Sequence, residues 1–223
     1  MLTVRDWMTA DVISVDPAIP LKDVARLLAE HRMSGLPVVD HGRVVGIISE
    51  GDLVIKERGP DAVARRPFGR IIGESRATQA HLAKVEASTA GEAMSTPAIV
   101  IAPERPLVEA AAVMAERRIN RLPVVENESL VGIITRADVV RAFARSDAEI
   151  AEEIRTAVLH RTLWLDPGVF DVSVTGGHAT IRGRVERRST AEMIERIPAL
   201  IPGIVGVEAD VSWDIDDQPA PGA

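Results

Sequence analysis

Two short segments of the sequence place a hydroxyl side chain three residues before an aspartate. They are Ser49 with Asp52 and Thr135 with Asp138, and each follows an apolar run typical of a buried strand. If a helix begins there, its first N–H groups and the positive end of its dipole favour an anion such as phosphate. The aspartate is unsuited to phosphate but can accept hydrogen bonds from the two hydroxyls of a ribose. Each segment is therefore predicted to grip the phosphate and sugar of a nucleotide.

The residue after each hydroxyl distinguishes the two segments by charge. Glu50 follows Ser49, whereas Arg136 follows Thr135. An anion is repelled by the first and attracted by the second, most strongly in a partly dehydrated cleft. We expect the Asp138 segment to form the better nucleotide site.

Helix capping is the plainer interpretation of the two aspartates, because aspartate is common at helix N-caps. Capping by Asp52 and Asp138 alone gives no reason for Ser or Thr three residues earlier, so we favour the nucleotide interpretation. Satisfaction of turn backbone is an alternative role for Ser49 and Thr135.

These segments belong to an internal repeat. Residues 8–53 and 94–139 align without a gap at an offset of 86 positions, with 18 identities in 46. In each copy a short apolar strand, at 12–15 and 98–101, ends at a proline-containing pair. Apolar residues at helical spacing follow Pro20 and Pro106, and two strands come next, at 36–39 and 44–48 in the first copy. Each copy is predicted to have the order βαββα, its last helix opening near the aspartate.

The repeated motifs resemble those of the CBS domain pair, named for the regulatory region of cystathionine β-synthase. Leu36-Pro37-Val38-Val39 recurs as Leu122–Val125, and Gly46-Ile47-Ile48-Ser49 with Asp52 recurs as Gly132–Thr135 with Asp138. The resemblance implies an α+β fold in which two pseudo-symmetric repeats pack as a pair. It also implies two clefts, each combining the hydroxyl-aspartate segment of one repeat with the approach to the second strand of the other.

The resemblance assigns further residues to each cleft, where branched aliphatic side chains would enclose an adenine ring. One site would combine Thr135 and Asp138 with Ile13, Met33 and Ser34; the other would combine Ser49 and Asp52 with Ile99, Ile119 and Asn120. Arg32 and Arg118, just before the second strands, are candidate phosphate contacts. Met33 and Ile119 are equally well explained as interface core. Arg121, at the position of Gly35, either blocks the Asp52 site or contacts phosphate there.

The C-terminal third has a different pattern, with the predicted order αββαβ. Residues 170–174 alternate into Thr175-Gly176-Gly177-His178, which predicts a hairpin with a glycine turn. A helix within 189–200 contains Pro198, which predicts a kink or an early end. Together with the run Ile201–Val207, this order is similar to the BON domain of bacterial envelope and osmotic-stress proteins.

These patterns divide the chain into five parts. We expect the first CBS repeat at 1–57, a connector at 58–90, the second repeat at 91–146, the BON domain at 147–215 and a disordered tail at 216–223.

Composition excludes several classes of function. The formal charge is −7, and residues 151–223 hold 12 acidic and 7 basic residues, a net of −5, so we expect no nucleic-acid partner. The chain has no cysteine, and its five histidines show no ligand spacing, so no metal site is predicted. No paired nucleophile and base is evident, and no enzyme is expected. Without a signal sequence or a membrane-spanning run, we expect a cytoplasmic location, with a peripheral position at the inner face of the membrane as an alternative.

The sequence as a whole predicts a non-catalytic sensor. Its CBS pair would bind an adenine nucleotide (ATP, ADP, AMP or a related adenosyl ligand) as a regulatory ligand, need no cofactor, and relay occupancy to the BON domain or a partner. We expect a homodimer through apolar helical faces near Val24–Leu28 and Val113–Met114. The alternative is a structural adaptor with vestigial clefts, whose BON domain docks on phospholipid or protein.

Overall fold

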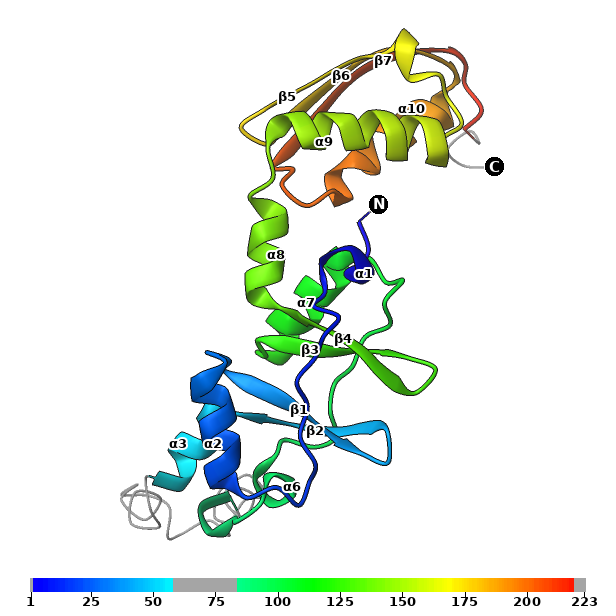
Figure 1. The fold of residues 1–223 in the computed structure, drawn as a ribbon. Helices are drawn as coiled ribbons and strands as arrows, with labels where there is room; N and C mark the ends of the chain where they lie inside the picture. Colours follow the sequence, from blue (N-terminus) through cyan, green and yellow to red (C-terminus); the bar gives the residue numbers. More distant parts are fainter. Residues whose placement is uncertain (1, 58–83, 219–223) are drawn as a thin grey trace, which may run out of the picture. The chain divides into compact units, whose positions relative to one another are not determined.

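The computed structural model describes residues 2–57 and 84–218 of the chain (Figure 1). These residues form two compact units: one holds 9–57, 84–102 and 123–133, and the other holds 2–8, 103–122 and 134–218. Most of the connector expected at 58–90 lies outside the described residues. Within its described end, residues 84–86 are helical and α6 spans Ala90–Ala93.

The first repeat builds most of the unit that contains residues 9–102. Its elements are α2 (Leu21–Glu30), β1 (Gly35–Asp40), β2 (Arg43–Ser49) and α3 (Glu50–Glu57). Strands β1 and β2 pair antiparallel, and the turn between them takes positive φ at His41 and Gly42. Helix α2 buries Leu21, Val24 and Leu28 against this hairpin, because those residues recur on one helical face.

The strands predicted at 12–15 and 98–101 are shorter than expected. Only one residue of each forms a bridge, Val15 with Val38 and Ile101 with Val124. The Val15 amide donates to the Pro37 carbonyl at 3.0 Å and the Val39 amide donates to the Val15 carbonyl at 2.9 Å, but the bond that would precede these in a parallel ladder needs an N–H from Pro37 itself. Proline has no N–H to donate, and Pro123 occupies the same position in the second repeat, so both ladders stop after one residue.

The second repeat has the same order of elements. Its hairpin of β3 (Arg121–Glu126) and β4 (Ser129–Thr135) contributes residues to both units, while α7 (Leu107–Arg117) and α8 (Arg136–Phe143) belong to the unit that continues to the C-terminus. The short helix α1 (Val4–Trp7) lies in that unit, where the Val4 amide donates to the Arg105 carbonyl at 2.9 Å.

The C-terminal part is a three-stranded sheet with helices on one face (Figure 1). The elements follow the predicted αββαβ order: α9 (Asp147–Glu153) with a π-helical continuation (Ile154–Thr162), β5 (Asp171–Thr175), β6 (His178–Arg187), α10 (Arg188–Arg196) and β7 (Gly206–Ile215). Strand β6 is central, antiparallel to β5 and parallel to β7. Helix α10 ends two residues before Pro198, which opens a short 3-10 turn, so the predicted early end is confirmed.

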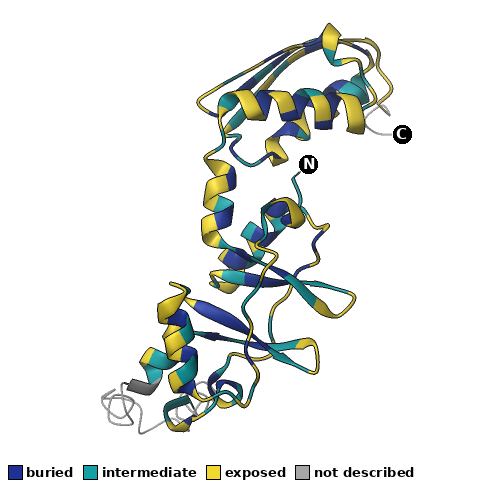
Figure 2. Cartoon of the chain, viewed as in Figure 1, coloured by how far each residue is buried: buried dark blue, intermediate teal, exposed yellow. Residues whose placement is uncertain are grey.

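The core of this C-terminal part lies between the sheet and its helices. One cluster of buried side chains joins the helices to the sheet. It contains Ile150 and Ile154 from α9 and its π-helical continuation, Ile194 from α10, and Val172 and Ile181 from the strands. Figure 2 shows the same separation of buried and exposed surface along these helices. The alternation predicted for residues 170–174 is thus the consequence of a sheet with one covered face.

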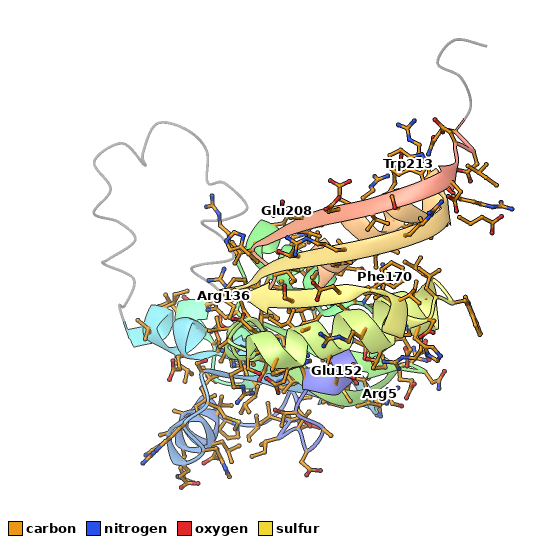
Figure 3. All side chains as sticks on the ribbon, turned by 90° about the horizontal axis from the view of Figure 1, so that it is seen from above. Arg5, Arg136, Glu152, Phe170, Glu208 and Trp213 are labelled. Atoms are coloured by element: carbon orange, nitrogen blue, oxygen red, sulfur yellow. The ribbon has the colours of Figure 1, made fainter. Side chains whose placement is uncertain are left out.

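The first residues of the expected tail have partners in α10. The Asp216 carboxylate accepts from Arg188, at 3.0 Å, and Asp217 accepts from the amide and hydroxyl of Ser189. Arg188 also lies over the ring of Trp213, 5.7 Å from its centroid, near the end of β7 (Figure 3). Acidic residues of 216–218 thus pair with the start of a helix, and the disorder expected from residue 216 stays a prediction; residues 219–223 lie outside the described residues.

Three of the residues named for dimerisation are buried within this chain. Val24, Leu28 and Met114 have exposed fractions of 3% or less, because they pack into the cores of their own repeats. These three side chains are not available to a second copy, whereas Leu27 and Val113 on the same helices are half-buried, and a dimer through these faces stays a prediction. Exposed apolar side chains are offered by α8, at Val140 and Phe143.

Candidate functional site

Asp138 lies at the third position of α8 and folds back onto the residue that caps the helix. Its Oδ2 accepts from the Thr135 amide at 2.7 Å and from the Thr135 hydroxyl at 2.6 Å, while the Asp138 amide donates to the same hydroxyl at 3.4 Å. The carboxylate is buried, with 3% of the residue exposed. The predicted transition from strand to helix, with Thr135 ending β4, is confirmed.

Asp52 repeats this geometry at the start of α3. Its Oδ2 accepts from the amide of Ser49 at 2.9 Å and from its hydroxyl at 2.7 Å. Asp52 is also buried, at 5% exposed. The duplication of the sequence motif is therefore a duplication of local structure.

The spacing of hydroxyl and carboxylate is explained by capping, contrary to our argument from sequence. A hydroxyl at the N-cap and an acid three residues later exchange hydrogen bonds in a capping box, so Ser or Thr at that distance is what capping requires. Thr3 with Asp6, Thr89 with Glu92 and Ser146 with Glu149 form the same box elsewhere in the chain. The motif alone is thus no mark of a ligand site.

Burial separates Asp52 and Asp138 from the other capping acids. Asp6, Glu92 and Glu149 are exposed, and hydrogen bonds from Ser146 hold the pKa of Glu149 below its ordinary value. An exposed acid can cap a helix equally well, so capping does not explain why the two repeated aspartates are removed from water.

Each buried aspartate has a cation on its second oxygen, and the two cations differ. Arg141, one turn along α8, contacts Oδ1 of Asp138, whereas Lys84 contacts Oδ1 of Asp52 from a position 32 residues away. Arg141 was recognisable in the sequence as an i+3 partner on one helix. Lys84 was missed, because no sequence pattern links it to Asp52.

The helix starts offer an anion fewer N–H groups than expected. The Arg136 amide donates to the Asn120 carbonyl at 3.0 Å, and the Glu50 amide donates to the Ser34 carbonyl at 3.1 Å. In α8 the third amide is also used, by the Thr135 hydroxyl. Arg136 and Glu50 are themselves exposed, so water screens the charge difference from which we ranked the two sites.

The other predicted site residues are described only within their own units. Ser34 and Asn120 lie beside the helix start of their own repeat, through the carbonyls just named. Ile13 and Met33 are partly buried against the first repeat's core, Ile119 is partly buried, and Ile99 is 38% exposed. The predicted pairing of these residues with the hydroxyl-aspartate segment of the opposite repeat involves both units and stays a prediction.

Arg32 and Arg118 follow the helices α2 and α7 in left-handed backbone conformation. Their φ angles are 52° and 54°, and both side chains are exposed. Each therefore takes part in ending a helix, the position that glycine or asparagine commonly fills. A role in contacting phosphate stays a prediction for both.

Two absences can be stated for residues 2–57 and 84–218. Within these ranges no group of three His, Asp or Glu side chains is placed to hold a metal ion. In the same part of the chain, every helix is too short or too polar to cross a membrane.

Comparison with known proteins places the repeats and the C-terminal part in different families. Residues 4–58 and 90–145 match the family described as CBS domain, and residues 146–214 match that described as BON domain. The chain is 33% identical over 149 residues to the CBS domain-containing protein CBSX1, chloroplastic, of Arabidopsis thaliana, a match that covers 63% of each protein. It is 26% identical over 163 residues to the CBS domain-containing protein YhcV of Bacillus subtilis, covering 73% of this chain and 99% of YhcV.

One of the solved structures that match this chain contains a bound ligand. The crystal structure of CBSX2, another Arabidopsis protein, in complex with AMP matches this chain with a TM-score of 0.50 at 30% identity. The match covers 64% of this chain and 96% of the CBSX2 chain.

Proposed function

The chain belongs to the CBS domain family, with a BON domain after its two repeats, and on this basis we propose that it is a non-catalytic regulatory protein that binds an adenine nucleotide. The observation that carries the proposal is the pair of buried carboxylates, Asp52 and Asp138, at equivalent positions of the two repeats. The AMP complex of CBSX2 supports adenosine as the ligand class.

We assign the nucleotide first to the Asp138 site. Asp138 is held by Thr135 through Oδ2, while the partner of its Oδ1 among the described residues is Arg141, whose side chain is 67% exposed. Breaking an ion pair to an exposed arginine costs little free energy, because the arginine is then solvated by water. Ribose hydroxyls can therefore replace Arg141 as the partners of Oδ1. Ile13, Met33 and Ser34 would then enclose the base.

The proposal is tested by titrating the purified full chain with ATP, ADP and AMP in a calorimeter. We expect saturable heat for at least one of them and a rise in the unfolding temperature, because a ligand that binds only the folded state stabilises it. CMP serves as the control for nonspecific phosphate binding. The absence of both heat and thermal shift at millimolar adenine nucleotide would contradict the function.

We further propose that bound nucleotide changes how the BON domain is presented to a partner. A ligand achieves this only by binding two arrangements of the chain with different affinity. The continuity of α8, which carries Asp138, with α9 of the BON domain through only three residues supports such a relay.

A membrane-docking adaptor is the second candidate, and exposed apolar side chains in the BON domain favour it. Trp164 is 88% exposed and Val169 is 62% exposed, both between the first helix and β5. The net charge of −5 beyond residue 150 opposes anionic lipid, so we expect any binding to be to zwitterionic vesicles. Flotation of the full chain with phosphatidylcholine vesicles, and its loss in Trp164→Ser, would support docking; an unchanged Trp164→Ser variant would contradict it.

A further inference from the structure

Lys84 joins Asp52 to a part of the chain that is outside the internal repeat. Its ammonium contacts Oδ1 of Asp52 and donates to the Ser95 hydroxyl at 3.1 Å. Ser95 is in turn fixed to β2, since its amide and carbonyl pair with those of Ile47 at 2.8 and 3.0 Å. The lysine therefore has two anchors, one of them a side chain held by backbone pairing.

Both repeats have the buried aspartate, but the cationic side chain that pairs with it comes from a different position in each. At the offset of 86 positions, Asp52 corresponds to Asp138, whereas Ile55 stands where the second repeat has Arg141. The first repeat thus lacks the arginine one turn along the helix, and Lys84 supplies the positive charge instead.

The two ion pairs differ in their access to water. The Lys84 side chain is 18% exposed and Asp52 is 7% exposed, whereas Arg141 is 67% exposed beside an equally buried Asp138. Charge attraction is stronger where water is excluded, and an ammonium held there attracts a carboxylate more than a neutral hydroxyl does. Ribose hydroxyls can displace Arg141 into water, but they would have to displace Lys84 from both of its partners.

We propose that Lys84 closes the Asp52 site to nucleotides, so that each chain binds one adenine nucleotide, at Asp138. This inference rests on the proposed function and decides its stoichiometry. Lys84 is then the residue that makes two sites of the same ancestry unequal.

The test is the number of AMP molecules bound per chain, measured by calorimetry on the wild-type chain and on Lys84→Gln. Glutamine removes the charge but leaves Asp52 an amide donor, which protects the fold better than alanine does. We expect one AMP per wild-type chain and two per Lys84→Gln chain, the affinity at Asp52 rising at least about tenfold. Lys22→Gln, which removes an exposed lysine of α2, is the matched control and should still bind one.

Asp52→Asn provides the second measurement. Added to Lys84→Gln, it should return the AMP stoichiometry from two to one, which assigns the second site to Asp52. Two AMP per wild-type chain, or weaker binding in Lys84→Gln, would overturn the inference while leaving the proposed function in place. No AMP binding to any variant would instead remove the function on which the inference rests.

Discussion

Replacement of Asp138 by alanine is expected to weaken AMP binding about 10- to 100-fold, the factor that corresponds to losing hydrogen bonds to a charged group, about 1.5–3 kcal/mol. The carboxylate is the group to which we assign the ribose hydroxyls, and Thr135 already fixes its orientation at 2.6 and 2.7 Å. Because no reorientation is needed on binding, the loss should appear in affinity. Calorimetric titration of the full chain measures it.

Two controls separate this effect from helix capping. Glu149→Ala removes a capping box of the same kind at α9, where the acid is exposed, and should leave AMP affinity unchanged. Asp52→Ala should weaken AMP binding less than Asp138→Ala does, because Lys84 already occupies Asp52. Equal or greater loss in Asp52→Ala would contradict the ranking of the sites, and weakened binding in Glu149→Ala would assign the effect to helix stability.

The helices and the hairpin that were predicted correctly depend on residues that lie close together in the sequence. Proline before Leu21 and Leu107, with apolar residues at helical spacing, placed α2 and α7 because both signals act within a few turns. The glycines at 176 and 177 placed the β5–β6 hairpin for the same reason. Because the two copies align without a gap, an element assigned in one repeat could also be assigned in the other.

What the sequence did not predict depends on contacts between distant residues or on burial. Lys84 reaches Asp52 across 32 positions, and a lone lysine in a connector has no spacing that signals an ion pair. The face of α2 proposed for a dimer was apolar, but amphipathicity alone does not tell which surface covers a helix, and Val24 and Leu28 pack into the core of their own repeat. The box formed by Thr135 and Asp138 was recognised as a pattern, but its capping role was underestimated.

The glycine turn of the BON domain yields a large predicted effect on stability. Gly177→Ala should lower the free energy of unfolding by about 3 kcal/mol, from overpacking of about 1–3 kcal/mol and left-handed strain of about 1 kcal/mol. A Cβ there would lie 2.6 Å from the Gly203 carbonyl oxygen and 2.9 Å from a methyl of Val205, at a φ of +77°. Urea unfolding followed by tryptophan fluorescence measures the change, since Trp164 and Trp213 both lie in this domain.

The neighbouring glycine is the matched control, because it shares the strain but not the crowding. Gly176 has a φ of +56° and nothing within 4 Å of a Cβ, so Gly176→Ala should cost only about 1 kcal/mol. Relaxation at Gly177 is opposed on both sides, since its amide donates to Asp147 at 3.0 Å and its carbonyl accepts from the Val205 amide at 2.8 Å. Equal losses in the two variants would mean that the turn moves away from Gly203, and that these two hydrogen bonds do not hold it in place.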